Sequence, residues 1–268
     1  MLALVVSTTT SDVELASDVL WSLGVVAIEE REVAGKVELW TSLGDDRDAV
    51  VAEVSQRLEP WPWRLVEIDE KVANTWRQHA QPVRVDRDFV ICPAWVPFDA
   101  EAGVTVVRID PGATFGLGDH PTTILSMRAI RAALHRGCTV LDVGCGSAVL
   151  AIGACVLGAS RTVAIDIAPA AVAVGRANAA ANGVAGRVDV STTPLSQIDG
   201  QFDIVVANIL APTLVQLADD LVRVVGPSGV LIISGVLADR HDHVEAALRP
   251  LHRSRRAALD GWAVLTLD

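Results

Sequence analysis

The feature that most constrains the fold is a set of three short apolar runs, each followed at once by a residue suited to hold a small molecule. The first run leads into Gly144, the second into Asp166 and the third into Asn208. Continuous apolar runs are typical of parallel strands buried on both faces, and doubly wound sheets bind ligands beyond the carboxyl ends of such strands. We therefore expect Gly144, Asp166 and Asn208 to line one edge of one sheet.

The second half of the chain alternates between helices and strands from Pro121 onward. The clearest helix covers residues 169–182, with Pro169 near its start and Gly183 after its end. Repeated βα units predict a parallel sheet with helices on both faces. The expected strands are residues 139–143, 162–166, 187–191, 203–207 and 229–234, with a last strand near 262–267.

The first seventy residues have a different pattern. Ser11 is the predicted N-cap of the first helix and Gly24 its C-cap. The order βαββαβ is that of the ferredoxin-like split fold. Its expected strands are residues 2–7, 25–31, 36–41 and 64–69, and its helices are 11–23 and 46–58. We predict a small domain over 1–70, a linker region over 71–109 with short strands near 83–85, 89–92 and 105–109, and a ligand-binding domain over 110–268.

Composition places the chain among globular proteins. Of its 268 residues 51% are apolar and 21% are charged, which is unlike a disordered segment. No apolar run approaches the ~20 residues that span a bilayer, and no basic segment followed by an apolar one opens the chain. The four cysteines lack the spacing of metal ligands. We expect a cytoplasmic protein with reduced thiols and no membrane partner.

The net charge of −11 is unevenly distributed. Residues 1–80 hold 7 Lys and Arg against 15 Asp and Glu, a balance of −8, whereas residues 81–268 have a balance of −3. So acidic a chain lacks the basic surface of a sequence-independent nucleic-acid binder, and we expect no direct contact with nucleic acid. The acidic end could attract a basic partner, although a solvated surface that keeps the protein soluble explains the charge equally well.

The glycine loop is the first candidate ligand site. Gly144 and Gly146 follow a strand and open a helix, where free backbone N–H groups and the positive helix end meet a ligand. A dinucleotide fingerprint would place its third glycine at position 149, which is Val149. Together with Asp142 just before the loop, this favours S-adenosylmethionine over a nicotinamide cofactor. The alternative is a tight strand-to-helix turn without a ligand.

Asp166 and Asn208 extend the candidate site. Asp166 lies 22 residues after Gly144, and a carboxylate there can accept hydrogen bonds from both hydroxyls of a ribose. The amide oxygen of Asn208 accepts hydrogen bonds without adding charge, which suits an amine that must become neutral to act as a nucleophile. Each residue has an alternative role as a helix cap.

Residues 110–123, DPGATFGLGDHPTT, form a glycine-rich segment that precedes a helix. Three glycines in seven residues allow the backbone to approach a ligand closely. Pro121 starts the helix and leaves the hydroxyls of Thr122 and Thr123 in its first turn. His120 could act as a base, but we favour a hydrogen-bonding or packing role. The six histidines are scattered, and we expect no metal site.

Taken together, residues 110–123, the glycine loop, Asp166 and residues 208–211 resemble the PrmA family, bacterial methyltransferases that act on the large-subunit ribosomal protein L-eleven. The family's segment reads roughly Asp-Pro-Gly-x-Ala-Phe-Gly-Thr-Gly-x-His-x-Thr-Thr. The resemblance covers most of the chain, including Trp76, residues 91–95 and the small first domain. The chain departs from the family at Thr114, which replaces Ala, at Leu117, which replaces Thr, and in a shorter first domain.

The resemblance implies a Rossmann-like class I methyltransferase sheet preceded by a ferredoxin-like α+β domain. It also implies an S-adenosylmethionine-dependent N-methyltransferase that modifies amino groups of a basic, large-subunit ribosomal protein. The amide chemistry of Asn208 makes it our candidate for orienting the amine. The implied cofactor contacts are Thr123, Gly144, Asp166 and Asn208, and further possible loop contacts are Phe115, Gly116, His120 and Gly146.

Three alternatives remain open. A related methyltransferase would act on another protein lysine or on a small amine. A non-catalytic homologue would bind the cofactor while Leu117 prevents transfer. A nicotinamide oxidoreductase is disfavoured by Val149.

Overall fold

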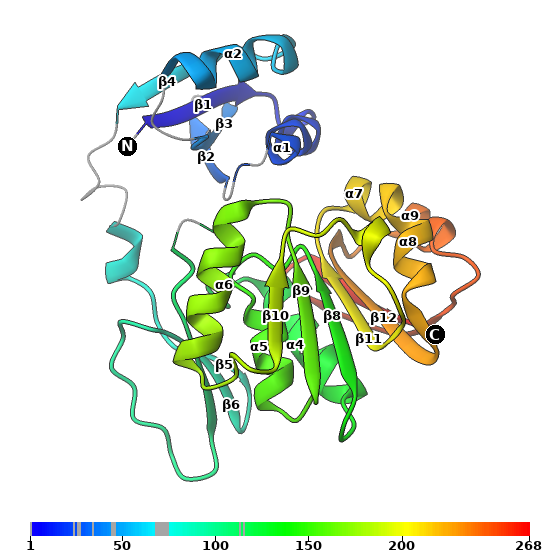
Figure 1. The fold of residues 1–268 in the computed structure, drawn as a ribbon. Coiled ribbons are helices and arrows are strands. Elements are labelled where there is room, and N and C mark those ends of the chain that lie inside the picture. The colour runs from blue at the N-terminus through cyan, green and yellow to red at the C-terminus, as the bar shows by residue number, and fades with distance from the viewer. Residues whose placement is uncertain are drawn as a thin grey trace. The chain divides into compact units, whose positions relative to one another are not determined.

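The computed structural model describes residues 2–268 apart from 24, 26, 27, 34, 44–46, 68–74, 113 and 115. The chain divides into two compact units, Met1–Ala80 and Gln81–Asp268 (Figure 1). Each unit has its own secondary structure, sheet and core. The functional roles expected for residues 1–70, 71–109 and 110–268 stay predictions.

The first unit has the predicted ferredoxin-like order. Its sheet runs β2-β3-β1-β4, and every pair is antiparallel. In β3, Val37 and Leu39 alternate with more exposed residues, so one face of the sheet packs on the helices. The elements are β1 (Leu2–Thr8), α1 (Val13–Ser22), β2 (Glu29–Val33), β3 (Lys36–Thr41), α2 (Arg47–Arg57) and β4 (Trp63–Glu67).

Two local predictions in this unit need correction. Ser11 is not the N-cap of α1, because the helix begins at Val13 and the carbonyl of Asp12 accepts the first helical bond, from Ala16 N at 2.9 Å. The Ser11 hydroxyl instead lies 2.8 Å from that of Thr9. The strand expected at 25–31 begins only at Glu29. Gly24, the predicted C-cap of the first helix, lies outside the described residues. So do residue 46, where the second predicted helix begins, and residue 69, where the fourth predicted strand ends.

The second unit contains a seven-stranded sheet in the order β10-β9-β8-β11-β12-β14-β13. The first five strands are parallel, and β14 is antiparallel to both of its neighbours. The chain order reverses between β8 and β11, which is a topological switch point. The strands are β8 (Thr139–Val143), β9 (Arg161–Ile165), β10 (Val188–Ser191), β11 (Phe202–Asn208), β12 (Val225–Leu237), β13 (Arg253–Leu259) and β14 (Trp262–Leu267).

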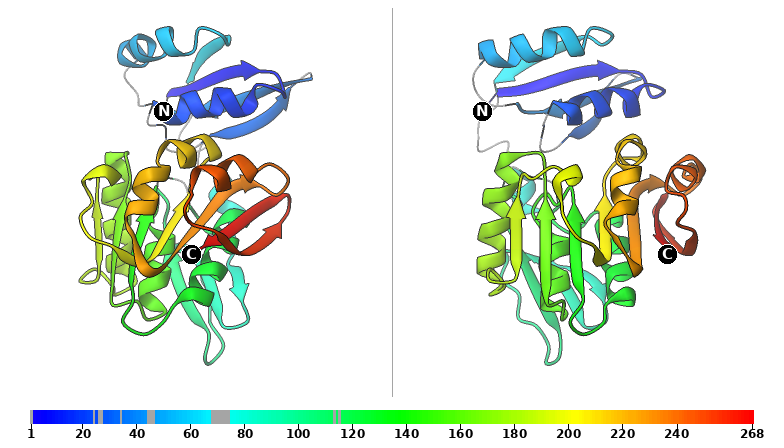
Figure 2. Two further views of the ribbon diagram at one scale, coloured as in Figure 1. Left: turned by 90° about the vertical axis from the view of Figure 1, so that its right-hand side faces the viewer. Right: turned by 45° about the vertical axis from the view of Figure 1, so that its right-hand side comes forward.

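Helices cover both faces of this sheet, as predicted (Figures 1 and 2). Val140 and Val206 pack with α4, α5 and α6 on one face, whereas Leu141 and Val205 pack with α7, α8 and α9 on the other. The alternation follows from the two-residue period of a strand. The helices are α4 (Pro121–Ala133), α5 (Val149–Val156), α6 (Pro169–Ala181), α7 (Ala211–Gln216), α8 (Ala218–Arg223) and α9 (Asp242–Ala247).

A second, three-stranded sheet precedes α4. Its strands are β5 (Val83–Asp86), β6 (Phe89–Pro93) and β7 (Thr105–Ile109), and β6 and β7 are parallel. Phe89, Ile91 and Ile109 are buried in the same cluster as α4 and α5. This sheet therefore belongs to the core of the second unit. Two short 3₁₀ segments, Thr75–Gln78 and Leu195–Gln197, complete the elements.

Strand β13 was not predicted. Its sequence, RSRRAAL, is almost wholly exposed and lacks the apolar pattern of a strand. The pairing with β14 forms it, through a turn in which Asp260 and Gly261 both have positive φ, the geometry of a tight hairpin. Among the described residues, no helix combines the length and apolar character that crossing a membrane requires.

Candidate functional site

The candidate site lies at the carboxyl ends of three adjacent parallel strands. Gly144 follows β8, Asp166 follows β9 and Asn208 ends β11. Strand β8 lies between the other two, with Val143 paired to Ile165 on one side and to Ala207 on the other. The structure therefore brings the three residues together at the switch point of the sheet.

The glycine loop folds back onto the end of β9. The N–H groups of Gly144 and Cys145 both donate to the carbonyl of Ile165, at 2.8 and 3.0 Å. Gly144 has φ +73°, and a Cβ placed on it would lie 2.4 Å from Cγ2 of Ile209. Gly146 also has a positive φ, of 52°. A side chain at Gly144 would clash with Ile209, so only glycine fits there without strain.

Asp166 connects the glycine loop to the next helix. One carboxylate oxygen accepts from Gly146 N at 2.9 Å, and the other accepts from Ala168 N, the N-cap of α6, also at 2.9 Å. Asp166 is half-buried. Because each carboxylate oxygen has two lone pairs, both oxygens can still accept from a ligand hydroxyl. The capping role and the ligand role are therefore compatible.

Asn208 has no structural role in capping. The N-cap of α7 is Leu210, and no side chain caps this helix. The half-buried amide of Asn208 makes no hydrogen bond to any other residue described in the structure. A polar group in this position is available for a ligand.

The start of α4 places Thr122, Thr123 and His120 at the end of the glycine-rich segment. His120 is the N-cap, and its Nδ1 accepts from Thr122 N at 3.3 Å. Its ring packs edge-on against Trp262, with the centroids 5.2 Å apart. Burial lowers the pKa of His120, which keeps the ring neutral. The structure thus gives His120 a hydrogen-bonding and packing role.

Thr123 differs from its neighbours because its hydroxyl is buried and has no hydrogen-bond partner among the described residues. The Ser126 hydroxyl, three residues further along α4, is buried in the same way. An unpaired buried polar group costs about 1–3 kcal/mol, so the Thr123 hydroxyl would gain from a hydrogen bond to a ligand.

The glycine-rich segment packs directly on the glycine loop. The Ser147 hydroxyl donates to the carbonyl of Gly116 at 2.5 Å. Gly118 has φ +108°, and a Cβ there would lie 2.4 Å from Cγ2 of Ile91. Thr114 uses its hydroxyl within the segment, donating to the carbonyl of Pro111 at 2.7 Å. Leu117 is half-buried, and Phe115 lies outside the described residues.

Two residues beside the site were not predicted to take part in it. Asp142 is only 1% exposed; one of its oxygens accepts from Ala151 N at 3.1 Å and the other has no partner among the described residues. Burial raises the pKa of Asp142 to about 7, and the charge of Asp166 contributes. Ile167 is 76% exposed directly after Asp166. An apolar residue following a strand-end acid is the signal that could have identified it.

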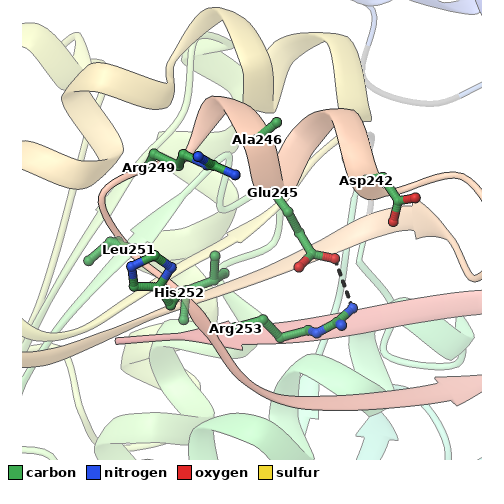
Figure 3. A pocket seen from close by; sticks show the side chains of 8 residues that line it. Asp242, Glu245, Ala246, Arg249, Leu251, His252 and Arg253 are labelled. Atoms are coloured by element: carbon green, nitrogen blue, oxygen red, sulfur yellow. Dashed lines mark hydrogen bonds and ion pairs between the residues drawn. The ribbon is translucent and has the colours of Figure 1, made fainter.

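A separate pocket of about 240 Å³ lies beside α9 and β13 (Figure 3). Glu245 and Arg253 form an ion pair of 2.9 Å in its wall. The nearby His241 ring has partners on both nitrogens, with Nδ1 lying 2.7 Å from Glu245 and Nε2 accepting from Arg256 at 3.1 Å. The grouping of His241, Asp242 and Glu245 is therefore an ionic network with its histidine already engaged.

Three features define a Rossmann-like, class I methyltransferase fold: the antiparallel strand β14, the glycine loop at the switch point and Asp166 at the end of β9. Among solved structures, a ribosomal protein L11 methylase from Lactobacillus delbrueckii subsp. bulgaricus is similar, with a TM-score of 0.66 and 33% identity over 70% of this chain and 98% of that one. Residues 1–268 match the family described as ribosomal protein L11 methyltransferase (PrmA), and the chain belongs to that family.

Curated relatives agree with this assignment. The ribosomal protein L11 methyltransferase of Geobacter metallireducens is 50% identical over 176 residues, and that of Geobacter sulfurreducens is 49% identical over 176 residues. Each match covers 66% of this chain and 58% of the relative. The chain thus spans less than two thirds of the length of these two relatives.

Proposed function

We propose that this chain is an S-adenosylmethionine-dependent protein N-methyltransferase whose substrate is ribosomal protein L11. The observation that carries the proposal is the position of Asp166 and Asn208 at the carboxyl ends of the strands on either side of β8, at the switch point of the sheet. Asp166 is held by two backbone N–H groups, and the Asn208 amide has no partner among the described residues. Membership of the PrmA family supports the same activity. A cytoplasmic location is part of the proposal.

The residues present fit the cofactor. The Asp166 oxygens keep lone pairs for a ligand, and the Asn208 amide and the buried Thr123 hydroxyl have no partner among the described residues. In the proposal Asp166 accepts from the ribose hydroxyls, and the exposed side chain of Ile167 offers an apolar surface to the base. Further loop contacts would come from Gly116, Gly146 and Phe115.

The cofactor supplies a methyl group already activated on a sulfonium, so the protein's task is to position a neutral amine in line with it. A lysine amine of pKa ~10.4 is neutral only about once in 2,500 molecules at pH 7. Asn208 can accept an N–H of that amine without adding charge, which orients the lone pair. His120 is engaged as a helix cap, so we propose that the proton leaves to water.

The substrate proposal uses the charge of the first unit. Residues 1–80 carry a balance of −8, and ribosomal proteins are basic. The same reasoning applies to a lysine side chain and to an α-amino group, so both are included as acceptor amines.

The test is incubation of the protein and S-adenosylmethionine with ribosomal proteins from a strain that lacks this enzyme, followed by intact-mass measurement. We expect one protein, L11, to gain whole methyl groups. Methylation of a different protein or of a small amine would favour the related-methyltransferase alternative. Cofactor binding without any methylated product would instead favour a non-catalytic homologue.

A further inference from the structure

Helix α6 contains Asn178 in its alanine-rich sequence, and Asn182, one turn later, is its C-cap. Asparagine is disfavoured inside helices because its side chain competes for backbone hydrogen bonds, so Asn178 calls for an explanation. Each amide bonds to both backbone groups of one residue near the end of β7. Asn182 pairs in this way with Arg108, at 2.8 and 2.7 Å, and Asn178 pairs with Asp110, at 3.0 and 2.9 Å.

Asn178 makes one bond more into the site. Its Nδ2 also donates to the carbonyl of Ser147 in the glycine loop, at 3.0 Å. The hydroxyl of Ser147 in turn donates to the carbonyl of Gly116. Asn178 is 4% exposed, and it thereby ties the first residue of the glycine-rich segment to the loop that follows β8.

The packing of α6 leaves little freedom around this connection. A Cβ on Gly175 would lie 3.1 Å from Cβ of Ala148, and a Cβ on Gly112 would lie 3.1 Å from Cγ2 of Val174. The helix also starts directly after Asp166, whose carboxylate bonds to Ala168 N. One helix therefore contacts the glycine-rich segment, the glycine loop and the strand-end acid.

We propose that Asn178 is a positioning residue for the cofactor site: its amide holds Asp110 and, through Ser147, Gly116 against the glycine loop before any ligand binds. This inference rests on the proposed function. Only an amide can accept from Asp110 N while donating to two carbonyls, because a carboxylate has no donor and alanine has neither group. Loops held in their binding conformation bind more tightly, since less ordering remains to be done on binding.

The test compares Asn178→Ala and Asn178→Asp with the matched control Asn182→Ala. The control removes the same kind of amide from the same helix, but it touches only Arg108 and Asn178, outside the two site loops. Losing the two donated bonds of Asn178 should weaken S-adenosylmethionine binding about tenfold in calorimetric titration. Asn182→Ala should lower thermal stability by as much as the Asn178 variants do, but it should leave the cofactor affinity within about twofold of wild type. With L11 as acceptor, the cofactor KM of Asn178→Ala should rise while kcat at saturating cofactor stays within about twofold.

A second readout needs no cofactor. Hydrogen exchange followed by mass spectrometry should speed up in residues 110–118 and 144–148 of Asn178→Ala, whereas in Asn182→Ala it should speed up only near Arg108. If Asn178→Ala fails to fold, Ser147→Ala removes the hydroxyl on Gly116 and should weaken cofactor binding in the same direction.

Equal cofactor affinity in wild type and Asn178→Ala would overturn the inference, and so would an equal loss in Asn182→Ala. A wild-type protein that binds no S-adenosylmethionine would overturn the proposed function instead. In that case the exchange pattern still decides whether Asn178 holds the two loops.

Discussion

At the scale of single residues, Asp166 is the side chain on which cofactor binding should depend most. Asp166→Ala removes both the ribose acceptor and the bonds to Gly146 N and Ala168 N. We expect it to weaken S-adenosylmethionine binding by roughly 1.5–3 kcal/mol, the range for hydrogen bonds to a charged group. Calorimetric titration measures this. The control is Asp189→Ala on neighbouring β10, whose side chain forms an exposed ion pair with Arg161. An Asp166 variant that binds the cofactor as tightly as this control would rule out the assignment.

Asn208 should affect the reaction more than the binding. Because its amide has no described protein partner, Asn208→Ala breaks no structural bond, and its effect reports on the ligands. We expect turnover at saturating cofactor to fall by more than the cofactor affinity does, since the lost contact belongs to the transfer geometry. Steady-state kinetics with L11 measures both quantities. Turnover within about twofold of wild type would show that Asn208 does not orient the amine.

Asp142 should make the stability of the protein depend on pH. The pKa of the buried acid is about 7 in the folded chain, against an ordinary value of 3.8. Between these values the unfolded chain is already ionised while the folded chain keeps its proton, so the free energy of unfolding should fall as pH rises from about 4 to about 7. Asp166 supplies the neighbouring negative charge, and the neutral Cys145 thiol lies close by.

Asp142→Asn removes this titration at nearly constant shape. In urea unfolding of the cofactor-free protein, its stability relative to wild type should therefore rise from about pH 5 to about pH 7. A stability difference that is the same at both pH values would mean that Asp142 does not titrate in this range.

At the scale of elements, the segment between β7 and α4 depends on close backbone approach. Gly118 combines φ +108° with a Cβ position 2.4 Å from Ile91, whereas Gly103 has φ +87° and open space around it. Gly118→Ala should therefore destabilise the chain by more than Gly103→Ala, whose cost is only the ~1–2 kcal/mol of a left-handed alanine. Urea unfolding of both variants separates the two costs. Equal losses would show that the contact with Ile91 relaxes freely.

At the scale of the whole molecule, the two units should divide the work. The candidate cofactor residues all lie in residues 81–268, whereas residues 1–80 carry most of the excess negative charge. A chain of residues 81–268 should keep cofactor binding and lose methylation of intact L11. Added salt should also weaken the activity of the full chain on L11, because exposed charges are screened beyond ~8–10 Å at physiological ionic strength. A folded chain of residues 81–268 that methylates L11 at the full rate would assign the first unit a stabilising role only.

The sequence by itself determined the order of the elements apart from β13, and the strand ends that carry Gly144, Asp166 and Asn208. Apolar runs, glycines and prolines are local signals, and the rule for parallel sheets converts them into one shared edge. Only the tertiary structure decided strand β13, the bonds of Asn178 and the Asp142 oxygen that has no partner among the described residues. Strand β13 has no apolar pattern and is formed by its partner, and Asn178 reaches groups 31 and 68 residues away. Such pairings depend on which surfaces meet once the chain is packed, and the spacing of apolar residues along the sequence does not contain this information.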